Sequence, residues 1–218
     1  MTDIPVKESE VLRYLGQRGT EADDAVLSAV RSCIRILKEE SEPKRVYRFF
    51  PLIWEGENRF RIEGMEVASR SLGKNFRGCG EVCLMAATIG FATDRHVERE
   101  TALGRVSRAV IFQAAGAALI ESWCDLVNEE IRRKAEKRGL FLRPRFSPGY
   151  GDFSISHQPE FMRILSVQKE IGVTLTETCL MMPSKSVTAV IGMSKENAHC
   201  LTAGCEACGK TDCLYRRA

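Results

Sequence analysis

The chain has 218 residues, 44% of them hydrophobic, and a formal net charge of +3 from 32 basic and 29 acidic side chains. This apolar content supports a sizeable core and excludes general disorder, while the near balance of charge, without a block of Lys and Arg alternating with aromatics, excludes a nucleic-acid surface. The start, Met1–Pro5, lacks a basic region followed by an apolar core, and no uninterrupted apolar run approaches the roughly 20 residues of a membrane span. We therefore expect a cytoplasmic protein with neither nucleic-acid nor membrane partners.

The first 40 residues or so predict helices, followed by the start of a sheet. Two short helices are expected between about Lys7 and Leu37, with a break near Gly16 and Gly19. Alternating polar and apolar residues over 45–50 and 59–62 then predict two half-buried strands.

The next segment predicts a helix, a buried strand and a turn. Residues 64–72 are expected to form a short helix, and the apolar run 81–90, bounded by glycines, predicts a strand buried on both faces. Thr93 or Asp94 is expected to cap the helix that follows. The turn carries no dinucleotide or phosphate-loop glycine pattern, so it predicts no nucleotide site.

Residues from about Ala102 to Lys137 predict one long helix, because apolar residues recur at three- and four-residue intervals and Gly139 fits its stop. The small residues 114–118 permit another element to approach closely. Glu121 lies one position from the apolar stripe. It is either an exposed or salt-bridged surface residue or a ligand contact.

The segment Arg145–Asp152 places a fixed cation, a turn, an aromatic ring and a carboxylate within eight residues. Pro148 sets one backbone angle and Gly149 permits a conformation closed to other residues, so the loop is expected to be pinned. One interpretation is a ligand loop in which Arg145 takes a carboxylate in a bidentate pair beside Tyr150. The alternative is an ordinary structural turn, and Asp152 has no assigned role.

After this loop, 161–171 is expected to be a helix closed by Gly172, and 173–181 and 186–193 are expected to be strands joined in a hairpin-like unit through 183–185. The sequence thus predicts an α+β fold, a mostly antiparallel twisted sheet with packed helices. The domain is expected to span 1–195, with its helical part over about 1–40, and to be followed by a cysteine-rich tail over 196–218.

The nine cysteines fall into two groups. Cys33, Cys124 and Cys179 are expected in the core, and Cys79 and Cys83 are given structural roles. The tail has the spacing C-x4-C-x2-C-x4-C, formed by Cys200, Cys205, Cys208 and Cys213. Four thiolates suit tetrahedral zinc or an iron–sulfur cluster, and reactive thiols or disulfides are the alternative.

Three motifs together carry a family resemblance. Arg145-x-x-Pro148-Gly149-Tyr150, then Leu175-Thr176-Glu177, then Met182-Pro183-x-x-Ser186-Val187 resemble the S-adenosylmethionine-binding activation domain of cobalamin-dependent methionine synthase in order and spacing. The similarity is clearest over 145–191. The start, residues 10–16, and the cysteine-rich end resemble small free-standing proteins named for that domain.

The resemblance implies the same α+β fold and S-adenosylmethionine binding by Arg145, Ser147, Gly149 and Tyr150, with Glu121 lining up with an acidic ligand of the family. Arg145 would take the ligand's carboxylate and Glu121 its ammonium group, as two opposed anchors. No residue is expected to act as an acid–base catalyst.

The function implied by the resemblance is reductive methylation, or reactivation, of cob(II)alamin carried by a corrinoid methyltransferase such as methionine synthase. The chain would be a component of that methyltransferase activity in methionine biosynthesis, with a flavodoxin or ferredoxin-type electron donor. This redox role is the only reason to prefer an iron–sulfur cluster over zinc in the tail. The alternatives are a non-catalytic zinc-binding adaptor and an S-adenosylmethionine sensor.

Overall fold

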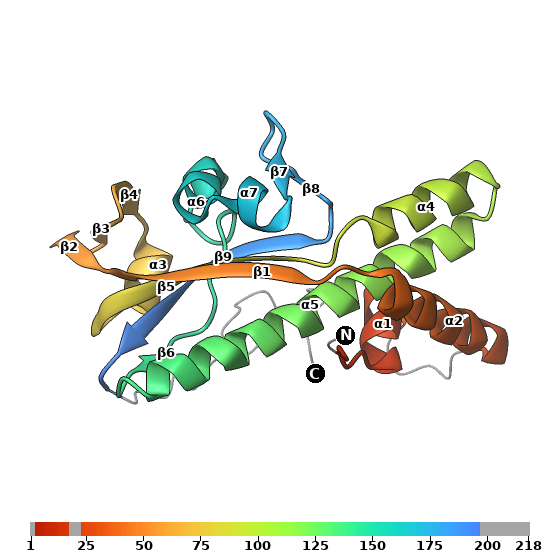
Figure 1. Ribbon diagram of the computed structural model, residues 1–218, viewed down its shortest axis with the longest axis horizontal. Helices are drawn as coiled ribbons and strands as arrows, with labels where there is room; N and C mark the ends of the chain where they lie inside the picture. Colours follow the sequence, from red (N-terminus) through yellow and green to blue (C-terminus); the bar gives the residue numbers. More distant parts are fainter. Residues whose placement is uncertain (1–2, 18–22, 197–218) are drawn as a thin grey trace.

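The computed structural model describes residues 3–17 and 23–196. Its centre is a four-stranded antiparallel sheet in the order β1-β5-β9-β6 (Figure 1). The strands are β1 (Lys44–Pro51), β5 (Cys79–Thr88), β6 (Phe141–Leu142) and β9 (Ser186–Ser194). The expected α+β fold with an antiparallel sheet and packed helices is confirmed, while residues 197–218 of the cysteine-rich tail lie outside the described residues.

The strand β5 is apolar from Val82 to Ala87 because both faces of the sheet are covered there. Its side chains alternate between two hydrophobic cores. Cys83, Met85 and Ala87 belong to one core, and Val82, Leu84 and Ala86 belong to the other.

The long helix α5 (Val106–Glu136) lies across one face of the sheet (Figure 1). The helices α1 (Glu8–Tyr14), α2 (Asp24–Glu40) and α4 (Ala92–Ala102) pack on α5 near one end of the sheet and complete the first hydrophobic core. Among the described residues α5 alone is long and apolar enough to cross a bilayer, but 61% of its apolar window is buried inside the fold. Burial of that kind is what the core helix of a folded domain shows, and length and composition alone are weak evidence for a span.

The second face carries shorter elements (Figure 1). These are a three-stranded sheet of β2 (Ile53–Gly56), β3 (Arg59–Ile62) and β4 (Met65–Ala68), the helices α3 (Arg70–Asn75), α6 (Gln158–Leu165) and α7 (Val167–Ile171), the 3₁₀ turn η1 (Ile155–His157), and the small pair β7 (Thr174–Leu175) and β8 (Met181–Met182).

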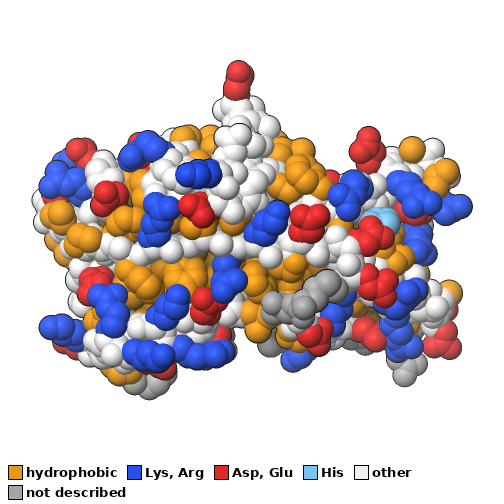
Figure 2. All heavy atoms as spheres, in the orientation of Figure 1, with side chains coloured by type: hydrophobic (Ala, Val, Ile, Leu, Met, Phe, Trp, Pro, Cys, Tyr) orange, Lys and Arg blue, Asp and Glu red, His pale blue; other side chains and the backbone are white. Residues whose placement is uncertain are grey.

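Figure 2 shows basic and acidic side chains interspersed over one side of the molecule, as the small net charge leads one to expect.

The helix predicted over 64–72 is wrong. Glu63 and Gly64 both have positive φ, 44° and 81°, and form the turn of a hairpin between β3 and β4. Met65 and Val67 are buried whereas Glu66 is exposed, which is the two-residue period of a strand. The helix α3 begins only after Ser69, whose side chain caps it by accepting from the Leu72 amide at 3.1 Å.

The strand predicted over 173–181 is also wrong in its middle. Only β7 and β8 are extended, and the chain between them turns, with Cys179 at φ 62° and half-buried rather than in the core. β8 pairs with β7 while β9 pairs with β5 and β6, so 183–185 connects two sheets and closes no hairpin.

Helix boundaries differ in three further places. The long helix begins at Val106, after a break at Gly104 with φ 71°. Neither Thr93 nor Asp94 caps α4: Thr93 is buried inside it, and Asp94 accepts a hydrogen bond from the Ser184 amide at 3.2 Å. The helix predicted over 161–171 is split by a left-handed residue into α6 and α7, although Gly172 closes it as predicted.

Candidate functional site

Backbone hydrogen bonds attach the start of the Arg145–Asp152 loop to β9. Phe146 and Val190 exchange both of their backbone hydrogen bonds at 2.9 Å, and the Arg143 amide donates to the Gly192 carbonyl at 2.8 Å. The loop therefore begins as a continuation of β6 along the edge of the sheet, which places Arg145 between that edge and α5.

The predicted turn is present in the loop. The Tyr150 amide donates to the Ser147 carbonyl at 3.2 Å, and the Gly149 amide donates to the Phe153 carbonyl at 2.7 Å. Gly149 has φ +95°, a conformation that side-chain-bearing residues rarely adopt. Tyr150 is 69% exposed, so its ring faces solvent at the tip of the turn.

Asp152 fastens the other end of the loop to the N-terminus of α3. Its carboxylate accepts hydrogen bonds from the Ser69 hydroxyl at 2.6 Å and from the amides of Arg70 and Ser71 at 2.7 and 3.0 Å. These three bonds, the Ser69 hydroxyl first, hold the pKa of Asp152 well below its usual range. Asp152 therefore positions the loop, a role that the sequence did not indicate.

Arg145 pairs with two carboxylates that project from α5. Its Nη2 lies 2.8 Å from Asp125 Oδ1 and 3.5 Å from Glu121 Oε2. The two acids are one helical turn apart, so both lie on the face of α5 that meets the loop. The side chains of Arg145, Glu121 and Asp125 are 22%, 39% and 62% exposed, so the cluster is open to solvent on its acidic side.

The fold brings together two of the five residues predicted to bind S-adenosylmethionine, Arg145 and Glu121. They belong to one ion-pair cluster, which also contains Asp125. Ser147 and Gly149 lie in the adjacent turn. The i, i+4 spacing of Glu121 and Asp125 on one predicted helix was a signal that could have identified Asp125 from the sequence.

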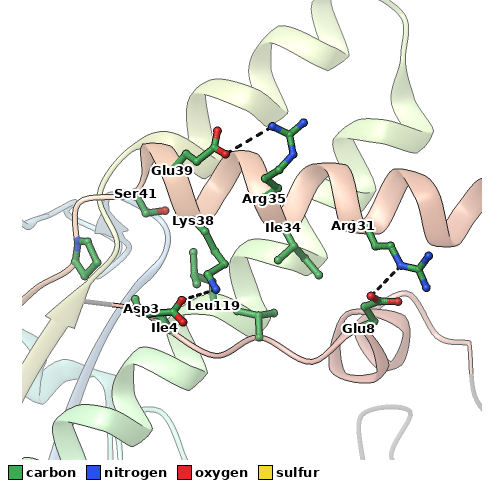
Figure 3. A pocket seen from close by; sticks show the side chains of 12 residues that line it. Asp3, Ile4, Glu8, Arg31, Ile34, Arg35, Lys38, Glu39, Ser41 and Leu119 are labelled. Atoms are coloured by element: carbon green, nitrogen blue, oxygen red, sulfur yellow. Dashed lines mark hydrogen bonds and ion pairs between the residues drawn. The ribbon is translucent and has the colours of Figure 1, made fainter. Parts of the chain in front are cut away.

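A hollow of about 500 Å³ lies elsewhere, between the N-terminal segment and α2 (Figure 3). Ile4, Ile34 and Leu119 contribute to its apolar lining, and the ion pairs Arg31–Glu8, Lys38–Asp3 and Arg35–Glu39 lie around it. None of the five predicted binding residues lines it. The candidate site is thus the solvent-exposed surface where the Arg145–Asp152 loop meets α5, and it is distinct from this hollow.

The four tail cysteines of the predicted metal site, Cys200, Cys205, Cys208 and Cys213, lie outside the described residues. Within 3–17 and 23–196 no group of three or more His, Cys, Asp or Glu side chains could hold a metal ion. Cys33 and Cys124 are buried as predicted, and burial raises the pKa of these thiols to about 11 and about 12. At neutral pH both thiols are therefore protonated, and both residues are part of the core.

Comparison with known proteins agrees with this architecture. The family described as "Vitamin B12 dependent methionine synthase, activation domain" matches residues 75–207, more than half of the chain. The crystal structure of the MetH reactivation domain bound to AdoHcy superposes with a TM-score of 0.63 at 14% identity, over 86% of this chain and 73% of that one. At this identity the superposition shows a shared fold. No curated protein matches the sequence. On the family match, the chain belongs to the activation domains of vitamin B12-dependent methionine synthase.

Proposed function

We propose that this protein binds S-adenosylmethionine where the Arg145–Asp152 loop meets α5. We further propose that it supports reductive methylation of cob(II)alamin on a corrinoid methyltransferase, methionine synthase, in the cytoplasm. The observation that carries the binding proposal is the position of Arg145, on a loop anchored at both ends and 3.5 Å from Glu121. A guanidinium beside a carboxylate suits the amino-acid end of the ligand, which carries one charge of each sign.

The relatives support this choice of ligand. The superposed MetH reactivation domain is bound to AdoHcy, the product left when S-adenosylmethionine gives up its methyl group. In the proposed complex Arg145 holds the ligand carboxylate, Glu121 its ammonium group, and Ser147, Gly149 and Tyr150 the adjoining part of the molecule. This chain needs no acid–base catalyst, since its task is to orient the sulfonium methyl group and exclude water.

The reaction itself belongs to the bound partners. One electron reduces the partner's cob(II)alamin, and the reduced cobalt displaces the methyl group from sulfur, leaving S-adenosylhomocysteine and methylcobalamin. The electron would come from a flavodoxin or ferredoxin-type donor. The thiolates of Cys200, Cys205, Cys208 and Cys213 form a donor set that suits an iron–sulfur cluster, which would supply one-electron chemistry, or structural zinc.

Calorimetry with S-adenosylmethionine tests the site directly. Arg145→Ala should weaken binding roughly 10- to 100-fold, because a charged hydrogen-bonded pair contributes about 1.5–3 kcal/mol. Arg145→Lys should recover only part of the loss, since an ammonium group cannot make the bidentate contact. Arg163→Ala is the matched control, because Arg163 is an exposed arginine of α6 that pairs with Glu160. Undiminished binding by Arg145→Ala would reject the assigned site.

A second assay tests the reactivation. An inactive corrinoid methyltransferase with its cobalamin in the cob(II) state is supplied with reductant and S-adenosylmethionine, and methylcobalamin is followed by its absorption. Addition of this protein should accelerate methylcobalamin formation, and Arg145→Ala should remove most of the acceleration. Equal rates with and without the protein would reject reactivation even if S-adenosylmethionine binds.

A further inference from the structure

One contact in the Arg145 ion-pair cluster has no part in the proposed binding mode. Asp125 Oδ1 accepts a hydrogen bond from Arg145 Nη2 at 2.8 Å, whereas Glu121 lies at the longer distance of 3.5 Å from the same nitrogen. This is the sole hydrogen bond donated by the Arg145 guanidinium to another described residue. The cation expected to bind a ligand carboxylate is therefore hydrogen-bonded to a carboxylate of its own chain.

We propose that Asp125 is an internal competitor for the ligand carboxylate: it occupies Arg145 in the free protein and is displaced when S-adenosylmethionine binds. This inference rests on the proposed function, because it assigns the Arg145 site to that ligand. It identifies Asp125 as a determinant of affinity and of the preference for ligands that carry a carboxylate.

The contact geometry indicates that displacing Asp125 from Arg145 costs little free energy. The Asp125 side chain is 62% exposed, and among the described residues it pairs with one guanidinium nitrogen, so water replaces its partner readily. Exposed ion pairs of this kind shift an equilibrium by only about two- to fivefold. A ligand carboxylate that engages the guanidinium in a bidentate pair forms a stronger contact and displaces it.

Substitution of Asp125 distinguishes competition from simple electrostatic attraction. S-adenosylmethionine is a net cation, so removing a nearby negative charge would by attraction alone weaken its binding. Competition predicts the opposite change, a stronger binding of S-adenosylmethionine. Asp125→Asn should tighten S-adenosylmethionine binding about two- to fivefold, because Arg145 is released.

The second part of the experiment uses a ligand that lacks the carboxylate. Decarboxylated S-adenosylmethionine cannot use Arg145, so Asp125→Asn should leave its affinity unchanged or lower it. Glu129→Gln is the matched control, since Glu129 is an exposed acid on the same helix that pairs with Arg132 and Arg133. It should alter the affinity for neither ligand. Thermal denaturation of each variant checks that the fold is retained.

The outcomes separate this inference from the proposed function. Tighter binding of S-adenosylmethionine alone by Asp125→Asn supports competition. If the native protein binds in an Arg145-dependent manner and Asp125→Asn binds equally or more weakly, Asp125 is a neutral or supporting contact and the inference fails while the function stands. An equal gain for both ligands also overturns it. If neither native protein nor variant binds S-adenosylmethionine, the proposed site fails and the inference with it.

Discussion

Asp152 joins the candidate loop to a helix that precedes it by some 80 residues in the chain. Its carboxylate makes a hydrogen bond with Ser69 and with the amides of Arg70 and Ser71, across sequence separations of 81 to 83 residues. The adjacent Gly151 allows this approach, because a Cβ there would lie 2.8 Å from Ser71 Oγ. The attachment of this end of the loop to α3 thus depends on one charge and one missing side chain.

Asp152→Asn is expected to lower the stability of the fold at neutral pH and to weaken S-adenosylmethionine binding. The folded-state pKa of Asp152 is depressed, so its contribution to stability is present above the unfolded pKa of roughly 4 and is lost as the pH falls below it. Urea unfolding should therefore show a lower midpoint for the variant at pH 7, and a difference from the native protein that shrinks toward pH 2. An equal difference at both pH values would contradict the assignment.

The helices α4 and α5 approach each other closely at Gly116. A Cβ at this position would lie 2.5 Å from Thr93 Oγ1, 2.6 Å from Thr93 Cγ2 and 3.1 Å from the Cε of Lys185. Thr93 is fully buried, so its side chain cannot move into solvent to make room. The small residues over 114–118 therefore have the structural purpose that the sequence indicated, with α4 as the element that approaches.

Gly116→Ala is expected to destabilise the protein even though alanine favours helix by about 1 kcal/mol over glycine. Overpacking costs roughly 1–3 kcal/mol in a site that cannot relax, and here the clash is with a buried side chain. Chemical denaturation followed by circular dichroism measures the free energy of unfolding. Gln113→Ala, at an exposed position of the same helix, should change it by less than about 0.5 kcal/mol. A higher free energy of unfolding for Gly116→Ala would contradict this, because it would show that α4 and α5 can move apart without loss of stability.

The core residues that the structure describes and all five proposed ligand contacts lie before residue 197. A chain ending at Glu196 is therefore expected to keep its melting temperature and its affinity for S-adenosylmethionine. It should lose the metal that we propose for the four tail thiolates. Iron, zinc and acid-labile sulfide are measured on anaerobically purified protein, with Cys205→Ser in the full chain as the matched variant. Metal retained by the shortened chain would contradict the tail assignment.

The pattern of polar and apolar residues predicted the correct type of element wherever a single periodicity dominated the segment. The buried run of β5, the alternation in β1 and β3 and the stripe of α5 each identify their element, because burial against a neighbouring layer requires that spacing. The pattern failed over 64–72 and 173–181, where short strands are joined by turns with positive φ angles at Glu63 and Cys179. Glutamate and cysteine rarely adopt positive φ, so the sequence does not predict these turns.

The sequence by itself determined the antiparallel α+β class, the loop with its cation and turn, and the resemblance that the family match bears out. These follow from residue order, because periodicity, turn chemistry and motif spacing are local. Only the tertiary structure decided that Asp152 caps α3 and that Asp125 shares Arg145 with Glu121. Such contacts join elements distant along the chain, and they exist only when sheet and helices pack and bring those side chains within hydrogen-bonding distance.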